Sequence, residues 1–476
     1  MNTEIDIVQH IKNIVQKSRT AQVSYEKYNQ KQVDEVVTAV AWAICNPTNN
    51  RKIAELSVET TKLGNVEDKI IKNKRKTVGL LRDLKNKKTV GIIDEDASKG
   101  IIEIAKPVGV VAAVTPATNP AATPVNNIIN AVKGRNAIIV SPSPSGSKVF
   151  EELLKCINTE LDKINAPKDL IQSLPSPISK DLTKELMKQV DLVIVTGSQN
   201  NVRQAYSSGT PSIGVGQGNV TVIVDETSNI KIAAQRIKQS KIFDNATSCS
   251  SENNLIILEE IYDDMLLALK SEGGLLFNDE QKNILEKSLW QNGQLNRNLL
   301  AKSVAFILNE ISIDGLDSEN SKFIMIEEKG IGKNSPFSGE KLSPILTIYK
   351  AKNFVEAKNI ANEILNYQGK GHSIGIHSED EKRILDLGLE LPVCRVIVNQ
   401  SHTFATGGSF TNGLPFSLSM GCGTWGGNSI DNNLNYKHFL NITKISKTIQ
   451  GEEPSLRDYF DDYCETYSPD DSKLLQ

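Results

Sequence analysis

The segment KPVGVVAAVTPATNP, residues 106–120, decides the fold, because it joins a buried strand to a turn rich in proline. Val108–Val114 is a continuous apolar run with several β-branched residues, which is typical of a strand covered on both faces. The prolines that follow it fix a turn. A helix at about Pro124–Val132 and a second buried strand at Asn136–Val140 come next. This order predicts a mostly parallel sheet covered by helices, and therefore an α/β fold.

The same alternation continues toward the C-terminus. Further strands are expected at Leu170–Leu174, Asp191–Val195, Val220–Asp225, Asn254–Leu258, Val304–Ile307, Ile345–Lys350, Ser373–His377 and Arg395–Asn399. Helices are expected between them at Ile230–Ile242, Tyr262–Glu272 and Phe354–Leu365. Residues 1–88 have apolar residues at helical spacing, with a stop at Asn46-Pro47, and Thr89–Ile93 with Ile101–Ala105 predicts a β-hairpin. The tail after Thr448 is acidic, and we expect it to lie on the protein's surface.

Composition argues against several classes of function. A net charge of −3 over 476 residues does not favour a nucleic-acid partner, and charge runs are interpreted as solvated helix faces. The six cysteines lie far apart without a CxxC pair, so neither a disulfide framework nor a metal site is predicted. No stretch reaches the ~18 apolar residues of a membrane span, and the N-terminus lacks a signal-peptide pattern. We therefore expect a cytoplasmic protein without membrane, nucleic-acid or metal partners.

Cys249 is the candidate nucleophile. An isolated cysteine is more often a small core residue, but this one stands in NATSCSSEN, residues 245–253, among small polar neighbours. It precedes a predicted strand, so it lies on a loop, where a thiolate has access to substrate and to backbone N–H donors. An exposed, ionisable thiol is the expectation. Cys422, in a glycine-rich loop at 407–427, is the second candidate.

Two further segments follow predicted strands. Asn119 offers an amide donor where the first strand ends, although it is equally suited to cap the next helix. Thr196-Gly197-Ser198 also follows a strand, and glycine there permits close approach to a ligand. The run at 214–219 is rich in glycine but does not match a phosphate-binding motif. Taken alone, the last two segments are as consistent with plain turns.

Taken in order, six segments resemble the aldehyde dehydrogenase superfamily and, within it, the CoA-acylating branch that includes sulfoacetaldehyde and succinate-semialdehyde dehydrogenases. These segments are residues 106–120, 133–146, 195–219, 243–253 and 369–377, and the pair 406–413 with 421–429. The resemblance implies a Rossmann-type cofactor domain, an α/β catalytic domain, a β-hairpin oligomerisation arm, and a homodimer or homotetramer. The implied boundaries are 1–228 with 408–440 for the cofactor domain, 88–106 for the arm, 229–407 for the catalytic domain carrying Cys249, and 441–476 for the C-terminal arm and tail.

The resemblance also implies roles for individual residues. Cys249 matches the catalytic thiol, and Asn119 matches the amide that, with the backbone N–H of Cys249, stabilises the oxyanion. Glu340 matches the glutamate that holds the nicotinamide ribose. The implied cofactor-binding set is Thr115, Pro116, Ser141, Ser143, Thr196, Gly197, Ser198, Gly216 and Glu340. The substrate-binding set is Thr118, Thr247, Ser248, Ser250 and Ser409, small polar residues that suit a short polar or anionic aldehyde.

Two departures from the family pattern bear on the reaction. Hydrolytic relatives carry a glutamate base where this chain has Val215, which favours transfer of the acyl group to coenzyme A over hydrolysis. Many acylating relatives have histidine where this chain has Ser143, which leaves the adenosine-side contacts open. No acidic residue lies in Ser141–Lys148 to repel a 2′-phosphate, so NADP is favoured over NAD. His372 is interpreted as a supporting residue in preference to an acid or base.

The expected function is therefore reversible oxidation of sulfoacetaldehyde or succinate semialdehyde to the acyl-CoA, through an acyl-cysteine thioester. A hydrolytic aldehyde dehydrogenase that gives the free acid is the alternative enzyme, and acetaldehyde is the alternative substrate. From another class, a non-catalytic protein that retains the fold is the remaining alternative. The presence of Cys249, Asn119 and Glu340 argues against it.

Overall fold

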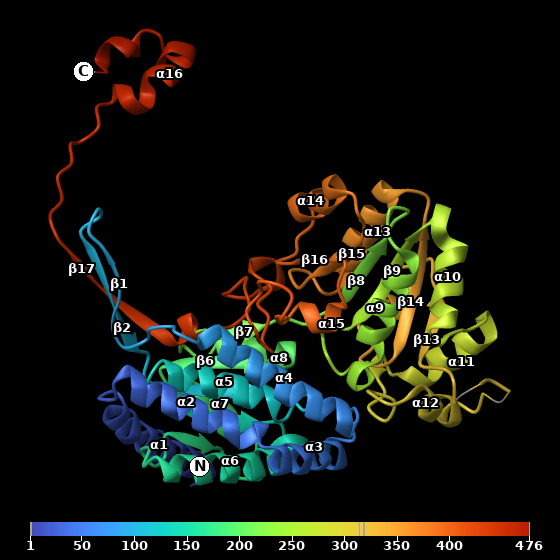
Figure 1. The fold of residues 1–476 in the computed structure, drawn as a ribbon, viewed down its shortest axis with the longest axis horizontal. Coiled ribbons are helices and arrows are strands. Elements are labelled where there is room, and N and C mark those ends of the chain that lie inside the picture. The colour runs from blue at the N-terminus through green and yellow to red at the C-terminus, as the bar shows by residue number, and fades with distance from the viewer. Residues whose placement is uncertain (1, 314, 318, 476) are drawn as a thin grey trace.

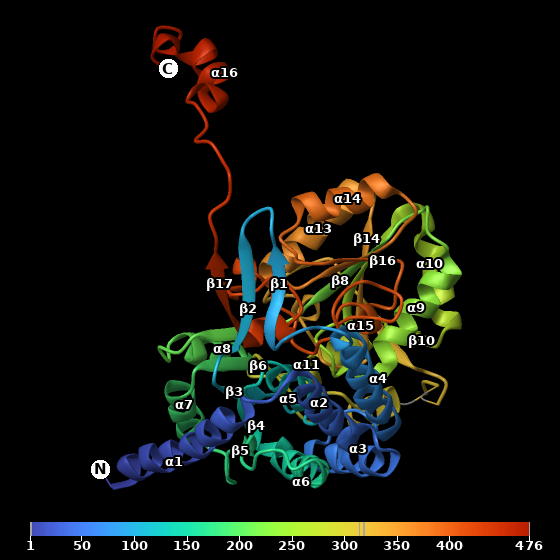
Figure 2. The ribbon, with the colours of Figure 1, turned by 60° about the vertical axis from the view of Figure 1, so that its left-hand side comes forward.

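The computed structural model describes residues 2–313, 315–317 and 319–475; residues 1 and 476, at the ends of the predicted domains, lie outside this range. Two parallel sheets with helices packed around them make up the body of the molecule, and an antiparallel sheet projects from it (Figure 1, Figure 2). The α/β class predicted from the sequence is confirmed. Every helix in the described chain is too short or too polar to cross a membrane.

The first sheet has five parallel strands in the order β5-β4-β3-β6-β7. Its strands are β3 (Val110–Thr115), β4 (Ala137–Pro142), β5 (Ile171–Ser173), β6 (Leu192–Thr196) and β7 (Ser212–Val215). The chain starts in the middle, moves outward through β4 and β5, and returns to place β6 against the other side of β3. The order of the strands reverses between β3 and β6, and ligands of parallel sheets bind at such a point, beyond the carboxyl ends.

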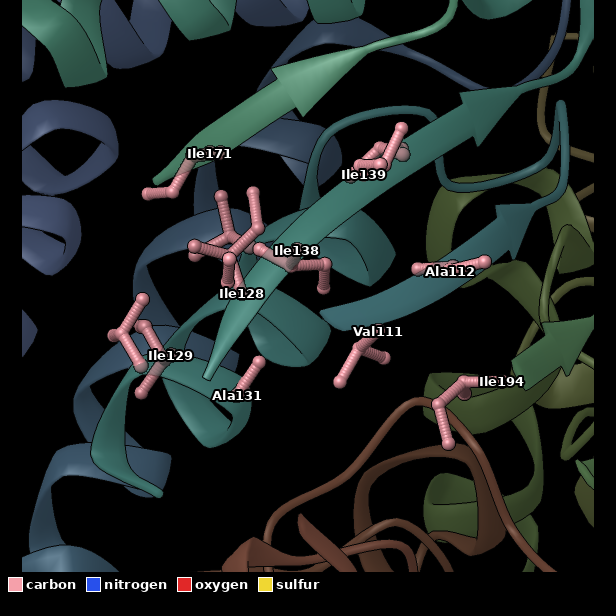
Figure 3. Packing of buried hydrophobic residues seen from close by; sticks show 14 of the residues in the cluster. Val111, Ala112, Ile128, Ile129, Ala131, Ile138, Ile139, Ile171 and Ile194 are labelled. Carbon is pink, nitrogen blue, oxygen red and sulfur yellow. The ribbon is translucent and has the colours of Figure 1, made fainter. Parts of the chain in front are cut away.

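The residues of the opening segment form the core of this sheet (Figure 3). Val111 and Ala112 on β3 lie beside Ile138 and Ile139 on β4, and all four side chains are fully buried. Ile128 of the following helix covers them. Because β-branched residues fit a pleated surface that is buried on both faces, the run forms a strand as predicted.

Eight helices accompany this sheet in the described chain. They are α1 (Asn2–Tyr25), α2 (Gln30–Cys45), α3 (Pro47–Thr61), α4 (Val66–Leu84), α5 (Ala122–Lys133), α6 (Ser147–Lys163), α7 (Lys180–Gln189) and α8 (Gln199–Tyr206). The predicted stop at Asn46-Pro47 is confirmed. The Asn46 side chain accepts hydrogen bonds from the backbone N–H groups of Thr48 and Asn49, and Pro47 opens the next helix, where its missing N–H is not needed.

The second sheet has seven parallel strands in the order β10-β13-β14-β9-β8-β15-β16. They are β8 (Val220–Val224), β9 (Glu252–Leu258), β10 (Gly274–Leu276), β13 (Phe323–Glu327), β14 (Ile345–Ala351), β15 (Ile374–His377) and β16 (Val396–Val398). The chain passes from one sheet to the other between β7 and β8, before the domain boundary expected at residue 228. The boundary itself stays a prediction.

The helices of the second half include one that was expected to be a strand. They are α9 (Ile230–Ile242), α10 (Tyr262–Ser271), α11 (Asp279–Leu289), α12 (Val304–Glu310), α13 (Phe354–Tyr367), α14 (Glu381–Glu390) and α15 (His402–Ala405). The prediction of a strand at Val304–Ile307 is wrong. Ser303 caps the first turn by accepting from the N–H of Phe306, and Val304, Ile307 and Leu308 are buried at helical spacing.

An arm extends away from the two parallel sheets. The predicted hairpin forms β1 (Gly91–Asp96) and β2 (Ile101–Pro107), and β17 (Leu440–Ser446) adds a third antiparallel strand that was not predicted. Beyond β17 the chain leaves the body, and α16 (Arg457–Tyr467) stands clear of it (Figure 1, Figure 2). We expected the tail to lie on the protein's surface. That expectation is wrong, because the tail stands away from the body of its own chain.

Short elements complete the fold. They are the pair β11 (Trp290–Gln291) with β12 (Gln294–Leu295), and the 3-10 turns η1 (Pro144–Gly146), η2 (Phe243–Ala246), η3 (Glu259–Ile261), η4 (Pro336–Ser338), η5 (Thr424–Gly426), η6 (Tyr436–Phe439) and η7 (Asp471–Leu474). Of these, η2 matters most for the site, because it leads directly into the loop that carries Cys249.

Candidate active site

A cavity of about 370 Å³ lies where the ends of strands from both parallel sheets meet. The residues that line it are Pro116, Thr118, Asn119, Thr196, Gly197, Ser198, Gln199, Val215, Gly216, Gln217, Thr247, Ser248, Cys249, Glu340, Leu342, Leu418 and Met420. Most of the predicted site residues are in this set. Segments more than 200 residues apart in the sequence therefore contribute to a single cavity.

The five-stranded sheet contributes its carboxyl edge to the cavity. β3 and β6 are parallel neighbours that pair as far as Val114 with Val195, so the turns that follow them emerge side by side at the switch point. Pro116 and Asn119 come from the first turn, and Gly197 comes from the second. The side chain of Ser198 caps α8 by accepting from the N–H of Asn201. A helix N-terminus therefore begins at the wall of the cavity, where it favours a negatively charged ligand.

The seven-stranded sheet contributes its amino edge. β8, β9 and β14 are adjacent parallel strands, and the segments that precede them carry Gly216, Cys249 and Glu340 to one side of the sheet. The segment before β8 lies tightly against the cysteine loop: a Cβ at Gly218 would stand 2.2 Å from the carbonyl oxygen of Cys249. Glycine is required there because two stretches of backbone meet.

Cys249 is partly exposed at the cavity wall, but its thiol is not poised to ionise. Burial raises its pKa to about 12, and the negative charge of Glu340 contributes to the rise. The expectation of an ionisable thiol is wrong, because burial disfavours the charged thiolate. The polar loop of Cys249 shares its cavity with the apolar side chains of Val215, Leu342 and Met420, all distant in sequence.

Glu340 contributes the single carboxylate among the residues that line the cavity. It is buried, and the loss of solvent raises its pKa to about 7, although a hydrogen bond from Gln217 opposes this. The Nε2 of Gln217 donates to a carboxylate oxygen at 2.9 Å. The side chain Oε1 of Gln368 accepts from the backbone N–H of Glu340 at 2.9 Å, which fixes the loop.

Asn119 is held by a buried ion cluster. Its Oδ1 accepts a hydrogen bond from Nζ of Lys72 at 2.9 Å, and the same ammonium donates to Asp244 Oδ2 at 2.5 Å. Lys69 also pairs with Asp244, at 3.1 Å. Burial alone would raise the pKa of Asp244, but the two lysines outweigh it, so its pKa lies below the ordinary value and the carboxylate stays charged.

Five predicted residues do not line the cavity. Thr115 is buried at the end of β3, and Ser141 is buried with its hydroxyl 2.8 Å from that of Thr183. Ser143 accepts from the N–H of Gly146 and closes a turn. Ser250 is buried with its hydroxyl 2.7 Å from that of Ser248, and Ser409 accepts from Arg75 at 3.3 Å. Their assignment to cofactor or substrate stays a prediction.

His372, His377, His402 and Cys422 are buried and do not line the cavity. Burial lowers the pKa of His372 to about 3, and its Nδ1 lies 2.7 Å from the hydroxyl of Ser373, so the ring is neutral. Burial also lowers the pKa values of His377 and His402 to about 4. Cys422 is fully buried, and burial raises its pKa to about 11. A supporting role for His372 agrees with this burial.

Sequence reasoning missed the lysines of α4. The run KIIKNKRK, residues 69–76, was interpreted as a solvated face, yet Lys69 and Lys72 are buried. One signal was available: Lys69, Lys72 and Lys76 recur at helical spacing, and the spacing places them on one side of the helix. Asp244 was missed as well, and its backbone conformation (φ 50°) is one that favours glycine or asparagine.

A partly exposed cysteine and a side-chain amide share one cavity with the strand ends at which parallel sheets bind nucleotides. This combination is typical of an enzyme that uses a cysteine nucleophile next to a dinucleotide site. The model of the aldehyde dehydrogenase family matches residues 7–274, and the chain belongs to this family. It is accordingly an oxidoreductase.

Relatives with assigned reactions cover nearly the whole chain. A sulfoacetaldehyde dehydrogenase (acylating) from Cupriavidus necator is 50% identical over 94% of this chain and 91% of its own length. A succinate-semialdehyde dehydrogenase (acetylating) from Clostridium kluyveri is 40% identical over 91% of this chain and 95% of its own length.

Solved structures agree with this assignment. An acetylating aldehyde dehydrogenase from Geobacillus thermoglucosidasius is 37% identical, with a TM-score of 0.90 over 95% of this chain and 99% of that one. A propionaldehyde dehydrogenase from Rhodopseudomonas palustris, solved with bound CoA and an acylated cysteine, is 26% identical. Its TM-score is 0.81 over 92% of this chain and 97% of that one.

Proposed function

We propose that this chain is a CoA-acylating aldehyde dehydrogenase that converts a short anionic aldehyde and NAD(P)⁺ to the acyl-CoA, reversibly. The observation that carries the proposal is one cavity that holds Cys249, Asn119 and Glu340 together with Val215. The first three supply a nucleophile, an oxyanion donor and a ribose contact. Val215 cannot act as a general base that activates water.

The residues at the switch point fit a nicotinamide dinucleotide. Gly197 leaves open space at the cavity wall, since a Cβ there would meet nothing closer than the side-chain nitrogen of Asn201 at 3.9 Å. The N-terminus of α8 follows directly and suits a pyrophosphate. Glu340 and Ser198 would hold the cofactor, which when bound supplies the acceptor for hydride. NADP is proposed over NAD because Lys148 is exposed at the start of α6.

The chemistry at carbon falls to Cys249 and Asn119. The thiol of Cys249 loses its proton to solvent, the thiolate sulfur adds to the carbonyl carbon of the aldehyde, and the carbonyl oxygen becomes an oxyanion. The amide NH₂ of Asn119 and a backbone N–H donate hydrogen bonds to that oxygen, which is typically the largest electrostatic contribution in such reactions. Loss of hydride then leaves the acyl group on sulfur as a thioester.

Release of the acyl group depends on which acceptor can be activated. Water needs a general base, and Val215 stands where hydrolytic relatives carry one. A thiol such as coenzyme A is partly ionised near neutral pH and needs less help. Acyl transfer to coenzyme A is therefore proposed over hydrolysis.

The products decide between these two reactions. Purified protein is incubated with sulfoacetaldehyde and NADP⁺, with and without coenzyme A, and thioester and free acid are quantified. Thioester that forms only with coenzyme A is the expected result. Free acid released at the full rate without coenzyme A would contradict the proposal and support the hydrolytic alternative.

The anionic class of substrate is supported by positive charge behind the cavity wall. Lys69, Lys72 and Lys76 lie along α4, and Lys76 is close enough to Cys249 for their charges to interact. Asp244 neutralises part of this charge and burial lowers the pKa of Lys76 to about 7, and the positive charge that remains favours a sulfonate or carboxylate over an uncharged chain. We place sulfoacetaldehyde ahead of succinate semialdehyde, and both ahead of acetaldehyde. A panel of these three aldehydes, compared by kcat/KM at equal ionic strength, tests the order.

Assembly and location complete the proposal. The antiparallel arm formed by β1, β2 and β17 projects from the body, and Ile92, Ile442 and Ile445 are exposed on it. Such an arm suits a homodimer or homotetramer, which the molar mass in solution tests. The six cysteines are all free, which suits the reducing cytoplasm.

A further inference from the structure

We infer that Lys72 is a positioning residue: together with Asp244 it fixes the orientation of the Asn119 amide, so that the NH₂ group and not the oxygen faces the cavity. This role rests on the proposed function, in which that NH₂ group donates to the oxyanion. Lys72 is buried and does not line the cavity, so its role is exerted through Asn119.

The geometry around Lys72 allows only one orientation of the amide. An ammonium has three donors and no acceptor. Nζ of Lys72 uses them on Asn119 Oδ1 at 2.9 Å, Thr247 Oγ1 at 2.9 Å and Asp244 Oδ2 at 2.5 Å. A rotated amide would place its own NH₂ against this ammonium, donor against donor. The oxygen therefore stays toward Lys72, and the NH₂ group stays available to a ligand in the cavity.

The ammonium is in turn held from several directions. Lys72 lies on α4 and is buried, and Asp244 is fully buried in η2, ahead of the cysteine loop. The carboxylate of Asp244 also accepts from the backbone N–H of Asn65 at 3.0 Å and from Thr247 Oγ1 at 2.8 Å. Since Thr247 lies two residues before Cys249, the same ammonium connects the loop of the nucleophile to the loop of the oxyanion donor.

Lys69 provides a matched comparison within the same cluster. It is also a buried lysine of α4, and it pairs with the same carboxylate at 3.1 Å. Its remaining contact is the backbone carbonyl of Thr118 at 3.4 Å, and it does not bond to the Asn119 side chain. Loss of either lysine removes one partner of Asp244, but only loss of Lys72 frees the amide.

The test compares Lys72→Met with Lys69→Met in the full-length protein. Steady-state aldehyde oxidation with coenzyme A gives kcat and KM, and thermal unfolding reports the fold. Lys72→Met is expected to lower kcat about a hundredfold, as loss of an oxyanion donor does, with a small change in KM for the cofactor. Lys69→Met is expected to lower kcat less than about fivefold, although both variants lose thermal stability.

Two further variants separate orientation from simple packing. Arginine, like lysine, has no acceptor, so the Lys72→Arg variant keeps the oxygen of Asn119 turned toward position 72. Glutamine has a side-chain carbonyl, so in the Lys72→Gln variant it can accept a hydrogen bond from a rotated amide. We expect the kcat of the Lys72→Arg variant to be at least about tenfold higher than the kcat of the Lys72→Gln variant. If Lys72→Met fails to fold, this pair decides the question. Equal losses in the two variants would overturn the proposal.

A double mutant and thiol alkylation complete the test. In an Asn119→Ala background, Lys72→Met should cause no further loss of kcat, because the group that it orients is gone. Alkylation of Cys249 by iodoacetamide uses no oxyanion donor, so its rate reports displacement of the cysteine loop, which Lys72 also contacts through Thr247. A rate within about twofold of the parent assigns the loss of kcat to the amide, and a larger change assigns it to the loop. If Lys72→Met and Asn119→Ala lower kcat additively, or if Lys72→Met lowers kcat no more than Lys69→Met does, then Lys72 has only a structural role.

Failure of this role is distinguishable from failure of the proposed function. If the parent enzyme makes thioester only with coenzyme A but Lys72→Met matches Lys69→Met, the positioning role alone is wrong. If the parent releases free acid without coenzyme A, the proposed reaction is wrong. The comparison of the two lysines would then still report on the oxyanion step.

Discussion

The two sides of the cavity differ in how much room they leave around the backbone. At the edge of the five-stranded sheet, a Cβ at Gly197 would meet no atom closer than 3.9 Å. At the edge of the seven-stranded sheet, a Cβ at Gly218 would fall 2.2 Å from the carbonyl oxygen of Cys249. One side is open, and the other is filled by its own chain.

This difference matches what each side is proposed to hold. A dinucleotide arrives from solution, so its side of the cavity has to keep space and unused donors. The nucleophile is part of the protein, so its loop can be fixed in advance by buried contacts with Lys72, Asp244 and Gly218. A substitution at Gly218 should therefore reduce kcat, and a substitution at Gly197 should mainly change binding of the cofactor.

The largest effect is expected from Cys249→Ala, which removes the proposed nucleophile from the crowded side. Aldehyde-dependent reduction of NADP⁺ should fall more than about a thousandfold, since no thioester can form. The rate is followed by absorbance of the reduced cofactor.

Cys422→Ala serves as the control for that variant. Its thiol is fully buried and does not line the cavity, so activity should stay within about threefold of the parent. A folded Cys422→Ala that loses activity as severely as Cys249→Ala would show that the wrong cysteine was assigned.

The next effect in size tests the comparison directly, by adding one methyl group to each side. Gly218→Ala should lower kcat about tenfold to a hundredfold, because the cysteine loop must shift and small displacements of a reacting group are costly. Gly197→Ala should leave kcat within about twofold and act on KM for the cofactor. If Gly197→Ala causes the larger loss of kcat, the two sides have been interpreted in reverse.

A smaller effect concerns the raised pKa of Cys249, to which the negative charge of Glu340 contributes. Because burial raises the pKa of Cys249 to about 12, only a small fraction of the thiol is ionised at pH 8. Alkylation by iodoacetamide, measured by mass spectrometry of the Cys249 peptide, should therefore rise about tenfold per pH unit from pH 7 to 10 without a plateau.

Glu340→Gln should speed this alkylation about threefold to tenfold at pH 8, because it removes a negative charge that raises the pKa of the thiol. Replacement of an exposed glutamate, such as Glu379→Gln, is the control and should leave the rate unchanged. A plateau near pH 8 in the parent protein would contradict the raised pKa.

The smallest effect is a gain of function at Val215, which lies at the end of β7 and lines the cavity. Val215→Glu introduces a carboxylate where hydrolytic relatives carry a base, so a low rate of acid release without coenzyme A is expected. Val215→Gln, which cannot accept a proton, should not show it. Free acid, quantified by chromatography after incubation without coenzyme A, is the measurement.

Prediction from the sequence succeeded where a structure is local. The strand and turn at 106–120 and the turn at 196–198 are encoded by neighbouring residues, so their place at the edge of a parallel sheet followed from the pattern. Val304–Ile307 shows the limit of such patterns, because a β-branched segment formed a helix once Ser303 capped it and its apolar residues found a core.

Prediction failed where a property depends on contacts across the chain. The polar residues around Cys249 predicted an ionisable thiol, but burial in the folded protein raises its pKa, and apolar residues of other segments, Leu342 and Met420, line the same cavity. Lys72 lies 172 residues from Asp244 in sequence. The helical spacing of the lysines at 69–76 places them on one face of a helix, but burial of that face depends on residues elsewhere in the chain. Burial and charge pairing at this distance are visible only in the folded protein.

The raised pKa of Cys249 has a consequence for the protein between turnovers. Peroxide oxidises the thiolate form of cysteine, and the first product, sulfenic acid, leads on to species that the cell does not repair. Burial raises the pKa of Cys249, so less of its sulfur is in the form that peroxide attacks. Peroxide should therefore oxidise this thiol more slowly than it oxidises a cysteine with a depressed pKa.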